Sequence, residues 1–533
     1  MMRGDKGRKL KMAERQKSFM DQVIEQRIEQ YGDKVFLYFK DQQVTYKELN
    51  ENVNRVANGL HDLGIRPGDK LGIMLPNCPE FLYSHFAILR IGASPVPINV
   101  ALKGEGLKYI IDNSESKAIF IDSSFLESLK RVRSELSGLK KEIYRIEEPA
   151  KAEIPKNATL YSDLLKSPPT PPDIDIGEPS FGVMYTSGTT GRPKGVAVKK
   201  INVEGFLTLW GAMQAGPDDT IYTCLPLYHG NALGISVMGT LFMGCSLALG
   251  ERLSASRFWD EIRKYNAVEF NSLGAMIPIL MKQPEKKNDA DNPVRIVLSA
   301  ATPKDVWEAF EKRFNLKIVE WFGMVDSPGY LINTEGKVGA MGKPIGEAEF
   351  AIFDDNDNEL PPGKTGELAF RVPGERPTSY YKMEKETEEA YRGGWFHTGD
   401  LAYRDEEDWY YFAGRKKEAM RRRGENISSW EVEQVINSHP KVLESAAVGV
   451  PFELGEEDVK AVVVLKEGEK LSPEELLDFC QERMAYFMVP RYVEFKDSIP
   501  KTGTHRPIYP PLKEEGVTPN TWDREKAGYK VKR

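Results

Sequence analysis

The first third of the chain alternates short apolar segments with amphipathic ones, and this alternation most restricts the fold. The segment KLGIMLP at residues 70–76 is typical of a buried strand, and residues 80–93 are typical of a helix that ends near Gly92. Thr45 and Glu48 form a capping box before another amphipathic helix. Such a succession of strands and helices predicts a parallel, buried sheet with helices packed on its faces.

The remainder divides into a second alternating region, an antiparallel region and a compact C-terminal unit. Residues 145–180 form a connection rich in proline and charge, and the second alternating region spans residues 181–335. Residues 338–413 resemble antiparallel strands joined by an Asp/Asn turn and a Pro-Gly turn. After Arg415 the pattern is that of a small α+β unit. We therefore predict an α/β protein with a large multi-lobed N-terminal body, which has parallel-type sheets and a smaller antiparallel subregion, and a small α+β C-terminal domain.

The composition indicates a globular protein whose main partner is not nucleic acid. The 533 residues include 73 Lys and Arg against 80 Asp and Glu, so the formal net charge is 73 − 80 = −7. A nucleic-acid-binding protein usually shows a strongly basic footprint, which this total lacks. The four cysteines lack the spacing of a zinc site or a redox dithiol, so we expect reduced, structural thiols. These cysteines are Cys78, Cys224, Cys245 and Cys480.

One uncharged stretch is long enough to raise the question of a membrane span. Residues 230–250 carry no charged side chain, but glycines interrupt the stretch and polar residues dilute its hydrophobicity. We expect a buried helix that runs into a buried strand. The basic N-terminal residues 1–17 precede no apolar segment, so they do not resemble a secretory signal. The sequence thus predicts a soluble, cytoplasmic protein without a transmembrane segment.

The segment YTSGTTGRPKG at residues 185–195 has the composition of a phosphate-binding loop between two apolar strands. Gly188 and Gly191 permit positive φ and close backbone approach, and Arg192 and Lys194 supply positive charge. Backbone N–H groups and hydroxyls can surround phosphate oxygens while cations offset their charge. The spacing is not that of a Walker A loop. The hydroxyl donors are Thr186, Ser187, Thr189 and Thr190.

With this loop and three further segments, the chain resembles the adenylate-forming superfamily over residues 30–510. The further segments are LPLYHGNA at 225–232, GWFHTGDL at 394–401 and AGRKKEAMRRRGENISSWEVE at 413–433. The resemblance implies a two-step reaction in which ATP and a carboxylic acid form an acyl-adenylate, which a thiol, usually that of coenzyme A, then converts into a thioester. It also implies Mg²⁺ at the phosphates and a mobile lid. Residues 423–429 are most similar to the carnitine/crotonobetaine-CoA ligase branch.

The resemblance also implies roles for individual residues. Asp400 is expected to accept hydrogen bonds from the ribose hydroxyls, with Arg415 beside it. Lys417 matches the hinge, which divides the chain into an AMP-binding domain at residues 1–416 and a lid domain at residues 417–533. Gly424 matches the glycine that leaves room for the pantetheine arm, and His229 is expected to border the acyl group. The phosphates are expected to contact Thr186, Ser187, Gly188, Thr189, Thr190, Gly191 and Lys194, and adenine is expected to contact Ala300, Ala301, Thr302, Phe322 and Gly323.

Two motifs depart from the pattern of the superfamily. The common Tyr-Gly-x-Thr-Glu motif is Phe-Gly-Met-Val-Asp here, so Val325 lacks the hydroxyl and Asp326 replaces the metal-linked glutamate. Aspartate can still bind Mg²⁺ through water. In the C-terminal motif, Arg506 replaces the catalytic lysine and His505 replaces the glycine before it. Arginine keeps the charge and can bind a carboxylate in bidentate fashion, so we expect Arg506 to orient the carboxylate and the phosphate.

Three functions are compatible with these motifs. The first is an AMP-forming acyl-CoA ligase that acts on a small-molecule carboxylic acid. The second is a stand-alone adenylation enzyme that loads the thiol of a carrier protein, and the third is a catalytically weakened nucleotide-binding relative. We favour the ligase, because the chain has no appended carrier domain and Gly424 permits a path for coenzyme A. The acid itself, and whether a second copy of the chain is also a partner in a homo-oligomer, cannot be read from these motifs.

Overall fold

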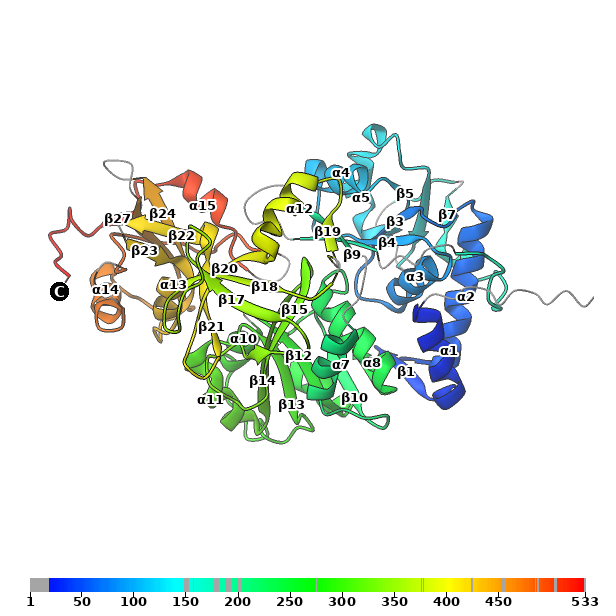
Figure 1. Cartoon of the computed structure of the whole chain (residues 1–533), viewed down its shortest axis with the longest axis horizontal. Helices are drawn as coiled ribbons and strands as arrows, with labels where there is room; N and C mark the ends of the chain where they lie inside the picture. The colour runs from blue at the N-terminus through cyan, green and yellow to red at the C-terminus, as the bar shows by residue number, and fades with distance from the viewer. Residues whose placement is uncertain are drawn as a thin grey trace, which may run out of the picture.

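The computed structural model consists of two lobes built around parallel sheets, an antiparallel region and a C-terminal domain (Figure 1). This arrangement confirms the predicted fold class. Among the described residues, no helix is both long and apolar enough to cross a bilayer. The structure describes residues 19–147, 153–156, 158–176, 182–186, 193–198, 203–274, 276–374, 376, 378–422, 425–451, 457–484, 486, 488–502 and 506–531.

The first lobe is a five-stranded parallel sheet in the order β4-β3-β5-β6-β7. The Thr45–Glu48 capping box begins its long helix as predicted, and Gly92 takes positive φ after the next helix. The strands are β3 (Lys70–Met74), β4 (Ser94–Pro97), β5 (Ser116–Asp122), β6 (Lys141–Arg145) and β7 (Thr159–Leu160). The helices are α2 (Tyr46–Asp62), α3 (Pro79–Arg90), α4 (Gly104–Asn113), η1 (Ser123–Phe125), α5 (Leu126–Lys130), η2 (Arg133–Glu135) and α6 (Tyr161–Leu164).

The second lobe is a nine-stranded sheet in the order β16-β15-β14-β13-β12-β10-β11-β1-β2, parallel in the centre and antiparallel at both edges. The uncharged stretch at residues 230–250 forms a π-helix continued by an α-helix, where one helix was predicted, and then the predicted buried strand. The strands are β1 (Val35–Phe39), β2 (Gln42–Thr45), β10 (Thr220–Thr223), β11 (Ser246–Leu249), β12 (Ala267–Leu273), β13 (Ile296–Ala300), β14 (Lys317–Met324), β15 (Ser327–Asn333) and β16 (Lys343–Pro344). The helices are α1 (Phe19–Tyr31), α7 (Val203–Ala212), the π-helix η3 (Asn231–Val237), α8 (Met238–Met243), α9 (Phe258–Lys264), α10 (Met276–Met281) and α11 (Lys304–Phe314).

The antiparallel region contains a four-stranded and a three-stranded sheet. Leu331 of the nine-stranded sheet shares a buried core with Phe350, Phe370 and Phe396 of the four-stranded sheet, so the two sheets pack together. The four-stranded sheet consists of β17 (Glu349–Phe353), β18 (Gly366–Arg371), β20 (Phe396–Arg404) and β21 (Tyr410–Arg415). The three-stranded sheet consists of β8 (Val183–Tyr185), β9 (Gly195–Val198) and β19 (Thr378–Tyr380), and α12 (Glu384–Ala390) and η4 (Arg392–Gly394) follow it.

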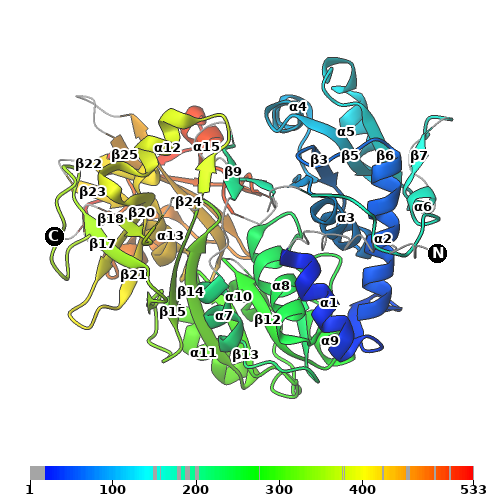
Figure 2. The ribbon, with the colours of Figure 1, turned by 45° about the vertical axis from the view of Figure 1, so that its right-hand side comes forward.

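The described part of the C-terminal domain combines a hairpin, a four-stranded sheet and several short helices. Ser472 and Glu475 form a capping box at the start of α14, and the Ser428 side chain caps α13. The strands are β22 (Ala419–Arg422), β23 (Glu425–Ser428), β24 (Val442–Pro451), β25 (Glu457–Leu465), β26 (Tyr492–Phe495) and β27 (Trp522–Asp523). The helices are η5 (Lys416–Glu418), α13 (Ser429–Asn437), α14 (Pro473–Gln481) and α15 (Tyr509–Glu515). Figures 1 and 2 show this domain and the first lobe on opposite sides of the molecule, with β9 between them in both views and β19 beside it in Figure 1.

Candidate active site

The predicted phosphate loop begins and ends on two paired strands. Tyr185 of β8 pairs with Gly195 of β9, and the N–H of Thr186 donates to the carbonyl of Lys194 at 3.0 Å. The N–H of Lys194 in turn donates to the Thr186 hydroxyl at 3.2 Å. These bonds close the base of the loop and fix where it leaves the sheet. Five residues predicted to contact phosphate lie outside the described residues: Ser187, Gly188, Thr189, Thr190 and Gly191.

Strand β19 joins Lys194 to Asp326. The Nζ atom of Lys194 lies 4.1 Å from the centre of the Tyr380 ring, a cation–π distance. The Tyr380 hydroxyl donates to Asp326 Oδ2 at 2.8 Å, and the Thr378 hydroxyl donates to the Asp326 carbonyl. Burial raises the pKa of Asp326, whereas the Tyr380 hydroxyl and Lys194 oppose that shift. A predicted metal-linked residue and a predicted phosphate-binding residue therefore lie close together.

Asp400 is a buried carboxylate that meets a cation from the neighbouring strand. Asp400 of β20 and Arg415 of β21 are paired in register, and Arg415 Nε lies 3.1 Å from Asp400 Oδ1. This contact is an ion pair without hydrogen-bond alignment, because Oδ1 has no hydrogen-bond partner among the described residues. Burial raises the pKa of Asp400, and Arg415 and Arg506 oppose the shift. The Asp400 side chain is therefore buried, but its Oδ1 atom is still able to accept a hydrogen bond.

Arg506 approaches this group from the C-terminal domain. Its Nη2 atom donates to Glu418 Oε1 at 2.7 Å, and its backbone N–H donates to the Thr502 hydroxyl at 3.1 Å. Because both Arg506 and Glu418 influence the pKa of Asp400, the loop that carries Arg506 lies near the ribose-binding candidate. For Lys417 only the backbone, in η5, is described, and Gly424 lies outside the described residues.

The small residues predicted to face adenine form a strained turn at the end of β13. Ala301 takes φ +68°, a left-handed conformation that costs a non-glycine residue about 1–2 kcal/mol. The carboxyl of Glu320 accepts from the N–H groups of both Ala301 and Thr302, the latter at 3.1 Å. Burial raises the pKa of Glu320 to about 8 against the effect of these bonds. The turn is therefore held by a buried carboxyl that is protonated at neutral pH.

The other predicted adenine contacts lie at the end of β14, next to Glu320. Phe322 pairs with Leu331 of β15. A Cβ atom on Gly323 would lie 2.6 Å from the Tyr330 ring and 2.8 Å from the Trp321 ring, so this position requires glycine. The Phe322–Gly323 strand end and the Ala300–Thr302 turn thus flank one carboxyl on adjacent parallel strands.

His229 lies two residues before η3, and the next residue, Gly230, is close to Val325, which precedes Asp326. A Cβ atom on Gly230 would lie 2.7 Å from Val325 Cγ2 and 3.8 Å from Met184 of β8, so the turn is pressed against both. The His229 Nε2 atom is buried without a hydrogen-bond partner among the described residues, and burial lowers the pKa of His229 to about 4. The ring is therefore neutral at physiological pH and can act only as a hydrogen-bonding group.

Sequence reasoning missed three residues that complete this arrangement. Glu320 had a visible signal, because it is an acidic residue within the apolar strand LKIVEWFG. Tyr380 and Glu418 had none, since each meets its partner across a long stretch of chain. The four cysteines agree with the prediction, because all are free and buried.

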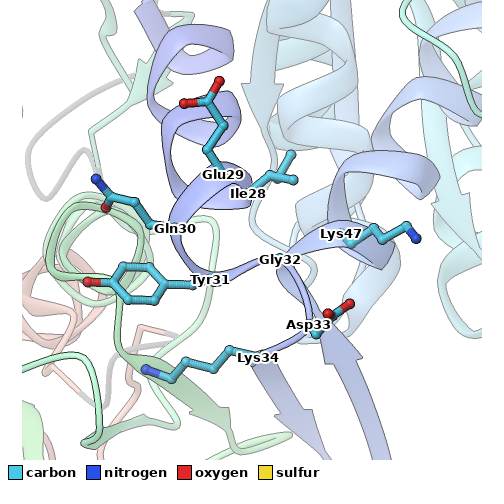
Figure 3. A pocket seen from close by; sticks show the side chains of 8 residues that line it. All are labelled: Ile28, Glu29, Gln30, Tyr31, Gly32, Asp33, Lys34 and Lys47. Carbon is cyan, nitrogen blue, oxygen red and sulfur yellow. The ribbon is translucent and has the colours of Figure 1, made fainter.

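A shallow hollow at the end of α1 is separate from this site. Figure 3 shows its lining, in which Tyr31 and Lys34 point away from Lys47. The ammonium of Lys34 donates to the carbonyl of Gly244 at 2.8 Å and so ties α1 to the end of α8. The lining includes none of the predicted site residues and so adds nothing to the site.

Comparison with known proteins gives matches along most of the chain. The family model of AMP-binding enzymes matches residues 24–377, and the model of the AMP-binding enzyme C-terminal domain matches residues 431–506. A crotonobetaine/carnitine–CoA ligase from Salmonella paratyphi B is 33% identical over 506 residues, which cover 91% of this chain and 96% of that protein. A second, from Salmonella typhi, is 34% identical over 507 residues with the same coverage of both chains.

Solved structures agree with these matches. The anthranilate CoA ligase AuaEII in complex with anthranoyl-AMP superposes with a TM-score of 0.83 at 24% identity, over 92% of this chain and 96% of that one. The ATP-bound MatB from Rhodopseudomonas palustris superposes with a TM-score of 0.81 at 25% identity, over 92% of this chain and 98% of that one. The fold of this chain is that of these ligases, and its first domain model spans more than half of the sequence. The chain therefore belongs to the AMP-binding enzyme family.

Proposed function

We propose that the chain is an ATP-dependent, AMP-forming acid–thiol ligase that joins a carboxylic acid to coenzyme A through an acyl-adenylate. The buried carboxylate of Asp400 carries the proposal, because its Oδ1 atom has no hydrogen-bond partner among the described residues and it lies among cations from two domains. A ribose diol supplies donors for such an acceptor, and a nucleotide supplies anions for the cations. The crotonobetaine/carnitine–CoA ligases among its relatives support the same reaction class.

The nucleotide would lie between the two strand ends and the phosphate loop. Adenine would contact the Ala300–Thr302 turn and the Phe322–Gly323 strand end, which share the Glu320 carboxyl. The phosphates would meet Lys194 and the loop from Thr186 to Gly191, whose base is closed by backbone hydrogen bonds. Backbone donors of such a loop require no reorganisation when they meet phosphate oxygens.

The donor chemistry of Asp326 fits a magnesium ion bound together with ATP. One carboxylate, phosphate oxygens and water are a common ligand set for Mg²⁺, and among the described residues no cluster of three His, Cys, Asp or Glu side chains offers a site made by protein alone. Tyr380 holds the Asp326 carboxyl in place through Oδ2. When bound there, Mg²⁺ would offset the negative charge of the phosphates.

In the first step, a carboxylate oxygen of the acid would bond to the α-phosphorus of ATP while the bond to pyrophosphate breaks. Arg506 would bring its charge to the two anions, and the neutral His229 would border the acyl group. In the second step, the sulfur of coenzyme A would bond to the acyl carbon, AMP would leave and the thiol proton would pass to solvent. Four statements stay predictions: the role of Lys417 as the hinge, the place of Gly424 beside the pantetheine arm, the division into residues 1–416 and 417–533, and a cytoplasmic location.

Pyrophosphate release by variants of Arg506 tests the proposal. We expect Arg506→Ala to lower the rate of pyrophosphate release by about 10²–10³-fold, as loss of one preorganised donor does elsewhere, and Arg506→Lys to retain part of it. Lys501→Ala is the matched control, because it removes a cation of the same loop that pairs with Glu444 at 2.6 Å. An Arg506→Ala enzyme as fast as the wild type would contradict the role of Arg506.

A panel of carboxylic acids with ATP, Mg²⁺ and coenzyme A tests the reaction itself. Formation of AMP and an acyl-CoA thioester with any acid supports the ligase. A thioester formed only on a carrier protein would instead identify a loading enzyme, and no AMP with any acid would identify a nucleotide-binding relative without ligase activity.

A further inference from the structure

One face of helix α13 carries two buried polar side chains. Ser429 and Glu433 are four residues apart on this helix, so their side chains leave it on the same face. Both side chains are buried. Buried hydroxyl and carboxyl groups need hydrogen-bond partners, and the partners of these two show what this face of the helix holds.

Glu433 holds the segment that follows Arg506. The Tyr509 hydroxyl donates to Glu433 Oε2 at 3.0 Å, and the N–H of Ala447 on β24 donates to Glu433 Oε1 at 2.7 Å. Tyr509 is the first residue of α15, and its ring lies in a buried core together with Leu512. The two oxygens of one carboxyl group therefore join α13 to β24 and to α15.

The backbone around Arg506 forms a closed loop base. The N–H of Thr502 donates to the carbonyl of Arg506 at 2.8 Å, and the N–H of Arg506 donates to the Thr502 hydroxyl at 3.1 Å. Two residues further out, the N–H of Ile508 donates to the carbonyl of Pro500 at 2.9 Å. Tyr509 directly follows this base, so a hydrogen bond that fixes Tyr509 also restrains the backbone of Arg506.

Ser429 holds the partner of the Arg506 side chain. Its hydroxyl donates to the carbonyl of Glu418 at 2.6 Å, and Glu418 Oε1 accepts from Arg506 Nη2 at 2.7 Å. The Glu418 side chain is buried, whereas 29% of the Arg506 side chain is exposed. Glu418 therefore holds the guanidinium while part of the arginine stays accessible to a ligand.

Glu433 lies close to the Arg506–Glu418 pair but does not compete for the arginine at neutral pH. Burial raises the pKa of Glu433 to about 8, and Glu418 and Arg506 act on that pKa in opposite directions, which places the pair near this carboxyl. Glu433 therefore keeps its proton at neutral pH and bears no charge there. A long arginine side chain that is already held in place loses less entropy when it meets an anion.

We propose that three side chains behind Arg506 are positioning residues for formation of the acyl-adenylate: Ser429, Glu433 and Tyr509. The proposal rests on the proposed function, since Arg506 is assigned there to the first step. Ser429 fixes the backbone of Glu418, and Glu433 fixes the loop base through Tyr509. A reacting group displaced by about 1 Å can lower a rate about 10²-fold, so such support matters for the reaction.

Pyrophosphate release by Tyr509→Phe tests the proposal, because this change breaks the contact with Glu433 and keeps the buried ring. The acid is the one in the panel from which the wild type forms AMP fastest. We expect the rate to fall by about three- to tenfold, the effect of one hydrogen bond. The second step, measured from chemically prepared acyl-adenylate and coenzyme A, should keep its wild-type rate. Ser429→Ala should behave in the same way and gives an independent test where Tyr509→Phe does not fold.

The Arg506→Ala background separates positioning from a general effect on folding. Residues that act through Arg506 should have no further effect once its side chain is gone, whereas independent effects on the structure would add to its loss. Tyr509→Phe and Ser429→Ala should therefore lower the rate of pyrophosphate release no further in this background. The same fold loss with and without Arg506 would overturn the proposal, and a wild-type rate in either single variant would overturn the assignment of that residue.

Two changes in the same domain serve as matched controls. Tyr529→Phe removes a tyrosine hydroxyl that donates to Asp478 at 2.7 Å. Ser445→Ala removes a buried serine hydroxyl that donates to Asn437, the last residue of α13, at 2.9 Å. Each control loses one hydrogen bond away from Arg506, so both should release pyrophosphate at the wild-type rate.

Binding of an uncleavable ATP analogue separates this assignment from the proposed function. Calorimetry with Mg²⁺ and an ATP analogue that has a methylene bridge between its α- and β-phosphorus atoms requires no turnover. Should no acid release pyrophosphate, the proposed reaction fails, but weaker binding in Tyr509→Phe that disappears in the Arg506→Ala background would still support the positioning role. Unchanged binding in Tyr509→Phe, or equal weakening in both backgrounds, would overturn it.

Discussion

Replacing Glu320 would release the turn that is expected to contact adenine. Glu320 is almost fully buried on β14 and accepts hydrogen bonds from the N–H groups of Ala301 and Thr302. The Ala301 backbone at φ +68° persists because these bonds favour it. In Glu320→Ala both bonds and most of the side chain are lost, so the turn can relax to a less strained conformation.

The expected loss can be estimated from these contacts. Two hydrogen bonds contribute about 0.5–1.5 kcal/mol each, and the cavity left by the side chain adds about 1–2 kcal/mol. Relaxation of Ala301 returns about 1–2 kcal/mol, so we expect the free energy of unfolding to fall by roughly 1–3 kcal/mol. A distorted turn should weaken the binding of adenine but not that of the acid. A loss of about 1.4 kcal/mol in binding free energy corresponds to a tenfold change, so the KM for ATP should rise by about tenfold or more while the KM for the acid changes little.

Glu320→Gln is the matched control, because it keeps the shape and one acceptor oxygen but does not titrate. The pKa of Glu320 is about 8 in the folded protein and about 4.3 in the unfolded chain. Between these values only the folded state holds the proton, so the stability of the wild type should fall as pH rises, by at most ~1.4 kcal/mol per pH unit, and level off above about pH 8.

Chemical denaturation and ATP kinetics at about pH 5.5 and about pH 8.5 would test this reasoning. The stability of Glu320→Gln relative to the wild type should increase between the two pH values. Two results would refute the argument: a Glu320→Ala variant with the wild-type KM for ATP, or the same pH dependence of stability in the wild type and in Glu320→Gln.

Three further changes have expected outcomes. Asp400→Ala should weaken AMP binding in calorimetry by about tenfold or more, since the proposed acceptor of the ribose hydroxyls is lost. Tyr380→Phe removes a hydrogen bond that lowers the pKa of Asp326, so that pKa should rise, and the Mg²⁺ concentration for half-maximal pyrophosphate release should increase most at low pH. Burial raises the pKa of Glu433 to about 8, so the stability of the wild type should fall as the pH rises toward about 8. Glu433→Gln should show a weaker pH dependence of stability, which thermal unfolding of the wild type and the variant over this range measures.

Local signals predicted the local structure well. The capping box at Thr45 begins the helix expected of it, because a cap is made by residues three apart in sequence. The uncharged residues 230–250 form two successive helices and a buried strand, because glycines and polar residues disfavour a membrane span and the length allows these elements. The motifs identified the family for the same reason, because each is a contiguous segment that can be recognised in the sequence without knowing the fold.

Contacts between distant segments were not predicted. Tyr380 reaches Asp326 across 54 residues, and Arg506 reaches Glu418 across 88. Both contacts depend on strand order and register, such as the pairing of β19 with β9, which one sequence does not define. The sequence also could not show that the buried Glu269 carboxylate has no cationic partner among the described residues, because a glutamate in an apolar strand can equally face a cation on the next element.

The charges of the site explain how a protein with a net charge of −7 can be suited to a polyanion. Arg415 and Arg506 each lie beside a carboxylate, and Lys194 acts on the carboxyl of Asp326, so these three described cations of the site each have an acidic group nearby. The net charge of the protein therefore attracts a nucleotide only weakly. We expect the nucleotide to bind because its anionic groups replace the present partners of cations that are already in position. The Arg506–Glu418 pair is the clearest case, because Arg506 must share its donors between Glu418 and the reacting anions. Bidentate donors suit such sharing better than a single ammonium does, which gives a physical reason for arginine at this position.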